Sequence, residues 1–128
     1  MQVIPKTGRL VAKNLGERGF SEANLAEPEV AIRFGCWYLH ELMKKFKGQE
    51  PLVFSAYNGG PHNVAYWVER KGELPLDEFI EEMRFTEARE YAKKVTRYVR
   101  LYRRIYEDRF KLYLPNTIDP DYGDNIHF

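Results

Sequence analysis

The stretch Ser55-Ala56-Tyr57-Asn58-Gly59-Gly60-Pro61 decides how this chain folds, because one apolar helix ends in it and another helix begins. The residues before it, Pro51 to Ala56, predict a short buried helix. Gly59 and Gly60 are expected to supply the positive φ angles that end a helix without strain at Cβ. Pro61 is favoured at the first position of the next helix, where its missing N–H costs nothing. The sequence therefore predicts a sharp corner between two helices.

This corner has two interpretations, which the residues alone leave about evenly balanced. It is either a plain connection between helices or a turn where the backbone lies close to a ligand. In the second interpretation, Tyr57 and Asn58 present a hydroxyl and an amide that can hydrogen-bond polar groups of a substrate.

Length and composition indicate one soluble domain. The chain has 128 residues, of which 44% are hydrophobic and 30% charged, and its net charge is +1. Such a charge gives no strong attraction of the whole molecule to nucleic acid or to an anionic membrane. No apolar run approaches the roughly 18 residues of a membrane span. The N-terminus lacks the pattern of a signal peptide, so we expect any export signal to lie outside this chain.

Helix signals recur along the chain and no alternating strand pattern appears, which predicts an all-α fold. The expected helices are, in order, Pro5 to about Leu15, Pro28 to Lys47, Pro51 to Ala56, about His62 to Glu69, Leu76 to Glu82, and Thr86 to about Leu112. Residues 17–26 are expected to form a loop. We expect residues 1–112 to form the domain and residues 113–128 to form an irregular tail.

Two helices carry an apolar stripe that predicts their buried face. In the helix that starts at Pro28, the stripe consists of Ile32, Gly35, Cys36, Leu39, Met43 and Phe46. In the last helix, it consists of Ala88, Tyr91, Ala92, Val95, Tyr98, Val99, Tyr102, Ile105 and Tyr106.

Several kinds of site are poorly supported. The three histidines, His40, His62 and His127, are far apart in sequence, so no metal site is expected. Cys36 is the single cysteine, which excludes an internal disulfide, and its place on the predicted buried stripe argues against a nucleophile. The Gly59-Gly60 pair lacks the Lys-Ser/Thr of a phosphate-binding loop. We therefore expect neither a cofactor nor a metal ion.

The last helix is rich in arginine, lysine and tyrosine, and it offers the only signal for a polyanion such as nucleic acid or an acidic wall polymer. A solvated face of an amphipathic helix explains the same pattern and is favoured about three to one. Glu87 lies at the start of this helix, and an ion pair with a nearby arginine is its structural interpretation. Glu81 precedes the break between two helices, so its side chain can be directed toward the Tyr57 corner.

Three stretches in this order resemble the soluble lytic murein transglycosylases, whose SLT domain has the goose-lysozyme-like fold. Residues 1–7 resemble the end of the family's Gly-Leu-Met-Gln segment and the Pro-x-Thr after it. Residues 56–61 resemble Ala-Tyr-Asn-Ala-Gly-Pro, and residues 81–91 resemble Glu-x-Ile-Pro-Phe-x-Glu-Thr-Arg-x-Tyr. This chain departs from the motifs at Gly59, Met83, Arg84 and Ala88. The match covers roughly residues 1–102.

The resemblance implies a reaction and a set of site residues. Members of the family cleave the β-1,4 bond between N-acetylmuramic acid and N-acetylglucosamine in peptidoglycan, leaving a 1,6-anhydromuramic end. One Glu suffices, acting first as acid and then as base, because the 6-hydroxyl of the sugar completes the displacement. By resemblance, Tyr57 would hydrogen-bond this Glu, Gln2 and Asn58 would hold substrate, Met1 would line the cleft, and Glu81 would contact a sugar.

The catalytic Glu of the family belongs to a Glu-Ser motif upstream of Gly-Leu-Met-Gln, and no position in this sequence matches it. The expected acid lies upstream of Met1, and the fold is expected to be a lysozyme-like helical domain without its first catalytic helix. Two hypotheses follow: part of a lytic transglycosylase that is inactive without the upstream Glu, or a non-catalytic glycan-binding or interaction module. The resemblance implies peptidoglycan glycan strands as the partner and a place in the periplasm or cell envelope, and no nucleic acid is expected. Loss of a packed helix also predicts self-association through exposed core surface.

Overall fold

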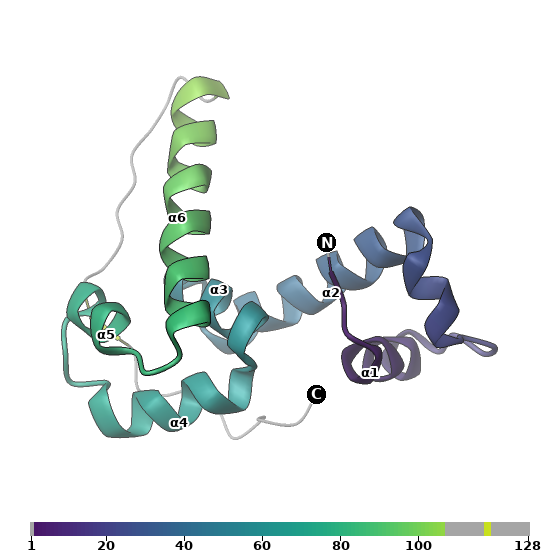
Figure 1. The fold of residues 1–128 in the computed structure, drawn as a ribbon, viewed down its shortest axis with the longest axis horizontal. Helices are drawn as coiled ribbons and strands as arrows, with labels where there is room; N and C mark the ends of the chain where they lie inside the picture. The colour runs from purple at the N-terminus through teal and green to yellow at the C-terminus, as the bar shows by residue number, and fades with distance from the viewer. Residues whose placement is uncertain (1, 107–116, 119–128) are drawn as a thin grey trace. The chain divides into compact units, whose positions relative to one another are not determined.

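The computed structural model describes residues 2–106 and 117–118, and every regular element in these ranges is a helix, which confirms the predicted all-α fold (Figure 1). The elements are α1 (Pro5–Leu15), the 3₁₀ helix η1 (Glu22–Ala26), α2 (Pro28–Lys45), α3 (Glu50–Gly59), α4 (Pro61–Lys71), α5 (Leu76–Glu82) and α6 (Thr86–Tyr106). None of these helices has both the length and the apolarity needed to cross a membrane.

The chain divides into two compact units, residues 1–41 and residues 42–127. In the first unit, Val11 and Phe34 are fully buried, and the rings of Phe20 and Phe34 lie 5.2 Å apart. α1 packs closely on the segment that carries η1, because a Cβ on Gly8 would lie 2.9 Å from Leu25 Cδ1. The expected loop at residues 17–26 therefore contains a short helix, η1, at whose start the Ser21 amide donates to Asn24 Oδ1 at 2.8 Å.

The second unit is built around α3, which is buried along most of its length. α3 packs against α4 and α6, and α5 packs against α6. The large side chains at the centre of this unit are fully buried: Phe46, Leu52, Val53, Val64, Phe79 and Met83. The prediction of a short buried helix over Pro51 to Ala56 is confirmed, and the helix extends to Gly59.

The predicted stripe of α2 is wrong at two positions. Ile32 is 53% exposed and Cys36 is also exposed, whereas Phe34, Tyr38 and Leu42 are buried. Apolar side chains occur on more than one face of this helix, so helical spacing alone fits two stripes and does not decide between them.

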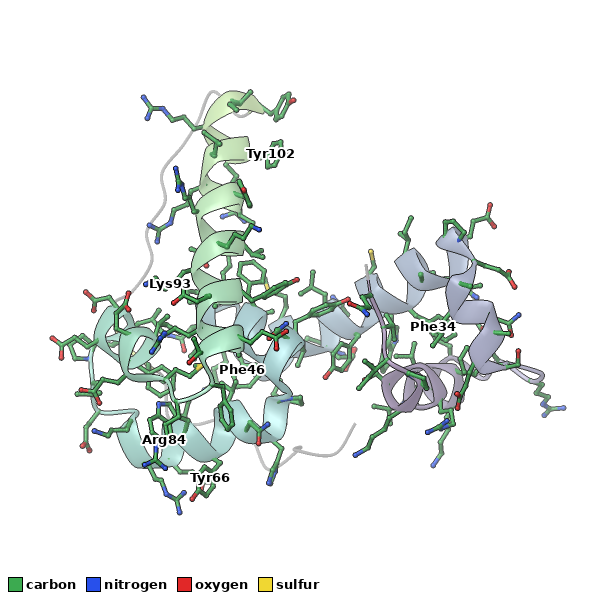
Figure 2. The ribbon with its side chains drawn as sticks, in the orientation of Figure 1. Phe34, Phe46, Tyr66, Arg84, Lys93 and Tyr102 are labelled. Carbon is green, nitrogen blue, oxygen red and sulfur yellow. The ribbon has the colours of Figure 1, made fainter. Side chains whose placement is uncertain are left out.

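The predicted stripe of α6 holds for its first half only. Ala88 and Ala92 are buried, but Tyr98, Tyr102, Ile105 and Tyr106 are exposed. α3 has ten residues and α6 has 21, which correspond to lengths of about 15 Å and about 31 Å. α3 therefore cannot cover the whole of α6. Figure 2 shows Tyr102 and Lys93 on opposite sides of this helix.

Two residues of the predicted tail are described. Ile118 is only 7% exposed, and Gln49 Nε2, just before α3, donates to the Thr117 carbonyl at 2.6 Å. The last predicted turn of the final helix, up to Leu112, and the other residues of the tail lie outside the described residues. The boundary between a domain at residues 1–112 and a tail at residues 113–128 stays a prediction.

Candidate functional site

The predicted corner lies between α3 and α4. Gly60 has φ +88°, and its amide donates to the Ala56 carbonyl at 2.9 Å, which closes the end of α3. Asn63 Nδ2 then donates to the Gly59 carbonyl at 2.7 Å. The expectation of a positive φ at Gly59 is wrong, because Gly59 is the last residue of α3 and only Gly60 makes the turn.

Gly59 is needed for a different reason, which is close contact with α6. A Cβ built on Gly59 would lie 2.8 Å from the Ala88 Cβ, closer than two carbon atoms can approach. Gly59 and Ala88 are two of the positions where this chain departs from the family motifs, and the fold places them face to face. The end of α3 is therefore held against the first turn of α6.

The two residues before Gly59 contact the same face of α6. The ring of Tyr57 stacks on the ring of Tyr91, with centroids 6.5 Å apart and planes 11° from parallel. Asn58 Nδ2 lies 3.5 Å from Glu87 Oε1, at the long limit of a hydrogen bond, and both side chains are exposed. We call Tyr57, Asn58, Glu87 and Tyr91 the tyrosine–asparagine corner.

The chemistry of this corner suits a ligand rich in hydroxyl groups. An amide offers two donors and an acceptor, and a carboxylate offers acceptors, so together they can hydrogen-bond neighbouring hydroxyls. Tyrosine rings add flat apolar surface beside these polar groups. The sequence predicts an ion pair between Glu87 and an arginine, whereas its contact in the structure is with Asn58. The sequence carries one indication that Glu87 belongs to this corner: it lies four residues before Tyr91, so both side chains are on the same helical face.

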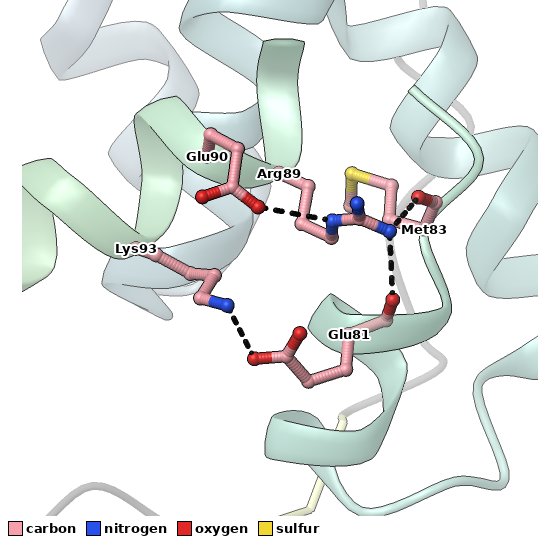
Figure 3. A network of polar contacts seen from close by, with 5 residues as sticks. All are labelled: Glu81, Met83, Arg89, Glu90 and Lys93. Carbon is pink, nitrogen blue, oxygen red and sulfur yellow. Dashed lines mark hydrogen bonds and ion pairs between the residues drawn. The ribbon is translucent and has the colours of Figure 1, made fainter. Parts of the chain in front are cut away.

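Glu81 lies at the end of α5, and Figure 3 shows its surroundings. Its Oε1 lies 2.7 Å from Lys93 Nζ, and this hydrogen bond raises the pKa of Lys93. Arg89 donates to the backbone carbonyls of Glu81 at 3.0 Å and Met83 at 3.4 Å, while its Nε donates to Glu90 at 3.3 Å. These contacts fix the connection between α5 and α6.

The Glu81 carboxylate and the tyrosine–asparagine corner are bound to different faces of α6. Their contacts on this helix, Lys93 and Tyr91, are two residues apart, which is about 200° around a helix. The carboxylate that the fold brings to Asn58 is that of Glu87.

The other two predicted site residues, Gln2 and Met1, lie in the first unit and outside the described residues, respectively. Gln2 is exposed and belongs to the unit of residues 1–41, whereas Tyr57, Asn58 and Glu81 belong to the second unit. Met1 lies outside the described residues.

The carboxylates of this region do not have the setting of a general acid. The side chain of Glu81 is 60% exposed, and Glu87 is exposed as well. A glycosidase acid that works near neutral pH needs a sheltered, apolar site. Among the described residues, no group of three or more His, Cys, Asp or Glu side chains is placed to hold a metal ion. The arrangement is suited to binding and does not supply the acid.

The sequence model of the family described as "Transglycosylase SLT domain" matches residues 1–80. This chain belongs to that family. A Haemophilus influenzae protein, whose name assigns it to the soluble lytic murein transglycosylases, is 36% identical over 99 residues, which are 77% of this chain and 17% of that protein. The resemblance to the soluble lytic murein transglycosylase family is thereby confirmed.

Two solved structures are similar to this SLT chain in fold and in sequence. The 70 kDa soluble lytic transglycosylase of Escherichia coli has a TM-score of 0.77 at 30% identity, over 93% of this chain and 19% of that one. An inactive mutant of the lytic transglycosylase Slt of Pseudomonas aeruginosa has a TM-score of 0.74 at 31% identity, over 98% of this chain and 20% of that one. This chain thus spans one fifth or less of the length of these relatives.

Proposed function

We propose that this chain is the glycan-binding part of a peptidoglycan lytic transglycosylase, which cleaves the β-1,4 bond between N-acetylmuramic acid and N-acetylglucosamine to give a 1,6-anhydro end. The observation that carries the proposal is the tyrosine–asparagine corner, in which the Tyr57 and Asn58 of the family motif are held against α6 by ring stacking and by the Gly59–Ala88 contact. Family membership supports the choice of substrate.

The proposal gives each site residue a role. Asn58 holds the glycan by hydrogen bonds, while Gln2 and Met1 keep the roles that the family pattern gives them, glycan binding and lining of the cleft. Glu81 has no role at the corner, because its carboxylate is bound to Lys93 on another face of α6. Tyr57 positions the general acid by a hydrogen bond to its carboxyl group. Glu87 is added to this set because it lies beside the Asn58 amide.

The general acid is proposed to come from a Glu-Ser segment that precedes Met1 in an active enzyme, because no position of this sequence matches that motif. The exposure of Glu81 and Glu87 supports this assignment. The chain by itself is therefore expected to bind peptidoglycan without cleaving it.

The test is digestion of purified peptidoglycan, with the soluble products analysed for 1,6-anhydromuropeptides. Three proteins are compared: this chain, the chain extended at its N-terminus by a segment that carries the Glu-Ser helix, and the extended chain with Asn58→Ala. We expect anhydro products from the extended chain only, and a lower yield with Asn58→Ala.

The outcomes separate the two hypotheses. If the extended chain binds peptidoglycan but releases no anhydro product, the chain is a binding module and the enzymatic proposal is wrong. If the unextended chain already cleaves, and Glu81→Gln abolishes the activity, then Glu81 is the acid and the assignment of an upstream Glu is wrong.

Localisation and self-association follow from the same proposal. A protein that acts on peptidoglycan works in the periplasm or cell envelope, which epitope labelling and cell fractionation can test.

Self-association through exposed apolar surface is supported by α6, where Tyr98, Leu101, Tyr102 and Ile105 are each about half exposed or more. Sedimentation velocity of the chain, with Tyr102→Ser as the variant, tests it; a monomer at all concentrations would contradict it.

A further inference from the structure

We propose that a cavity between α5 and α6, together with the arginine row beside it, is a docking site for an acidic peptide segment of a partner protein. The cavity has a volume of about 500 Å³, which is within the range of ligand sites. It is lined by Pro51, Leu76, Asp77, Ile80, Glu81, Ala92, Lys93, Thr96, Arg97 and Arg100. This inference goes beyond the glycan-binding function and does not depend on it.

The cavity combines an apolar floor with a cationic edge. Leu76, Ile80 and Ala92 are buried side chains that supply the floor. The Lys93 charge at this edge is already neutralised by Glu81 at 2.7 Å. The second carboxylate of the lining, Asp77, has a contact of its own. Three cations and two carboxylates leave the lining a net charge of +1. The remaining positive charge comes from Arg97 and Arg100, which have no carboxylate partner among the described residues.

Arg104 continues the same edge along α6. Arg97, Arg100 and Arg104 are spaced by three and four residues, so they lie on one face of the helix. We call these three residues the arginine row. Arg104 also lacks a carboxylate partner within the described part of the chain, in contrast to Arg103, which pairs with Glu50 at 2.6 Å. Three guanidinium groups on one face, none of them paired with a carboxylate of the described residues, are suited to a carboxylate ligand, which each can bind through two parallel hydrogen bonds.

The length of the row favours a peptide over a single small anion. Arg97 and Arg104 are seven residues apart, which is about 10 Å along the helix. An extended chain advances about 3.3 Å per residue, so the row matches carboxylates spread over three or four residues of a peptide. The apolar floor beside the row adds a place for one aliphatic side chain. The occupant is thus expected to carry several carboxylates around one apolar residue.

The row lies on the opposite side of α6 from the tyrosine–asparagine corner. Arg100 and Tyr91 differ by nine residues, which places them about 180° apart around the helix. In Figure 2, Lys93 lies on the cavity side of α6 and Tyr102 lies on the opposite side of the helix. A peptide on this face would leave the corner accessible, so both ligands can be bound at once.

The probe is a fluorescein-labelled peptide, Glu-Glu-Leu-Glu-Glu, with blocked ends, and its binding to the whole chain is measured by fluorescence anisotropy. Two control peptides replace the four Glu by Gln, or the Leu by Gly. We expect binding that weakens with salt, almost none with the Gln peptide, and weaker binding with the Gly peptide.

Matched double variants test the position of the site. Arg97→Ala with Arg100→Ala is expected to lower affinity roughly tenfold or more, because two charge-assisted hydrogen-bonding groups are lost. Arg84→Ala with Lys94→Ala removes the same charge from exposed residues outside the cavity and is expected to change affinity less than threefold. Circular dichroism verifies that both variants keep their helix content.

Several results would overturn the proposal. Equal loss in the two double variants would mean that the peptide responds to net charge only. If the Gln peptide binds as tightly as the Glu peptide, or if the Glu peptide does not bind at low salt, an acidic peptide is excluded as the partner. A duplex DNA of matched charge that binds more tightly, and is equally sensitive to the loss of Arg97 and Arg100, would assign the row to nucleic acid.

Discussion

The contact between Gly59 and Ala88 makes a sharp prediction about stability. In Gly59→Ala, the new methyl group would lie 2.8 Å from the Ala88 Cβ, and a Cβ cannot rotate away as the end of a flexible side chain can. The end of α3 must therefore move away from α6. Overpacking of this kind costs about 1 to 3 kcal/mol, whereas replacing Gly by Ala in a helix gains up to about 1 kcal/mol. We expect a net loss of about 1 kcal/mol in the free energy of unfolding.

Ala88→Gly supplies the matched background, because it removes the atom that the new methyl group would meet. In that background, Gly59→Ala has space and should be neutral or stabilising. The free energy of unfolding is measured by urea denaturation, followed by circular dichroism, for the four proteins of the cycle. The expected coupling between the two positions is about 1 to 2 kcal/mol in favour of the double variant.

Additive effects of the two substitutions would contradict a limiting contact between Gly59 and Ala88. If Gly59→Ala changes stability by the same amount with and without Ala88→Gly, the two residues do not limit how closely α3 approaches α6. The binding assay gives a second readout, because a shift of α3 also moves Tyr57 and Asn58. Gly59→Ala should weaken peptidoglycan binding, and Ala88→Gly should restore part of it.

Three further predictions concern contacts around this site. In Arg103→Ala, Glu50 stays buried without its cation. We expect the free energy of unfolding, measured by urea denaturation, to fall by about 2 kcal/mol. This is below the full cost of breaking a buried pair, because the Arg103 side chain is 37% exposed. Glu81→Gln removes the hydrogen bond that raises the pKa of Lys93, so its pKa should fall in an NMR titration. The Glu81–Lys93 contribution to stability is present at neutral pH and is lost as pH rises through that raised pKa. Ile118→Ala should cost about 2 to 4 kcal/mol, because Ile118 is 7% exposed.

Each of these has an outcome that would contradict it. Equal stability of Arg103→Ala and the parent would mean that Glu50 finds another partner or water. If the Lys93 pKa is unchanged in Glu81→Gln, the hydrogen bond to Glu81 is not what raises it. A change below about 0.5 kcal/mol for Ile118→Ala would be typical of a surface residue and would contradict the burial of Ile118.

The sequence was informative wherever a local signal is sufficient. Pro5, Pro28 and Pro61 mark the first residues of three helices, and Gly16 ends α1 with φ +69°. The helix of Leu76 to Glu82 was also predicted with its boundaries. Such signals act within a few residues, because caps, fixed proline φ angles and glycine turns do not depend on the rest of the chain.

Features that depend on distant residues could not be predicted. The role of Gly59 is set by Ala88, 29 positions away, so a pair of glycines could not reveal which one turns and which one packs. Likewise, Glu81 lies just before α6 and Glu87 lies in its first turn, so the sequence places both near the same helix end. Only the packing of α3 on α6 brings Glu87, and not Glu81, to Asn58. The exposed half of α6 had the same periodicity as its buried half, because periodicity does not report the length of the neighbouring helix.

Binding of peptidoglycan by the chain itself tests the proposed glycan site most directly. The measurement is co-sedimentation with insoluble peptidoglycan, for the parent, for Asn58→Ala and for the control Asn14→Ala, whose exposed amide donates to the Leu10 carbonyl of its own helix. We expect the parent and Asn14→Ala to bind alike, and Asn58→Ala to bind at least fivefold more weakly, which is about 1 kcal/mol. Unchanged binding of Asn58→Ala would contradict the assignment of the tyrosine–asparagine corner as the glycan-binding wall.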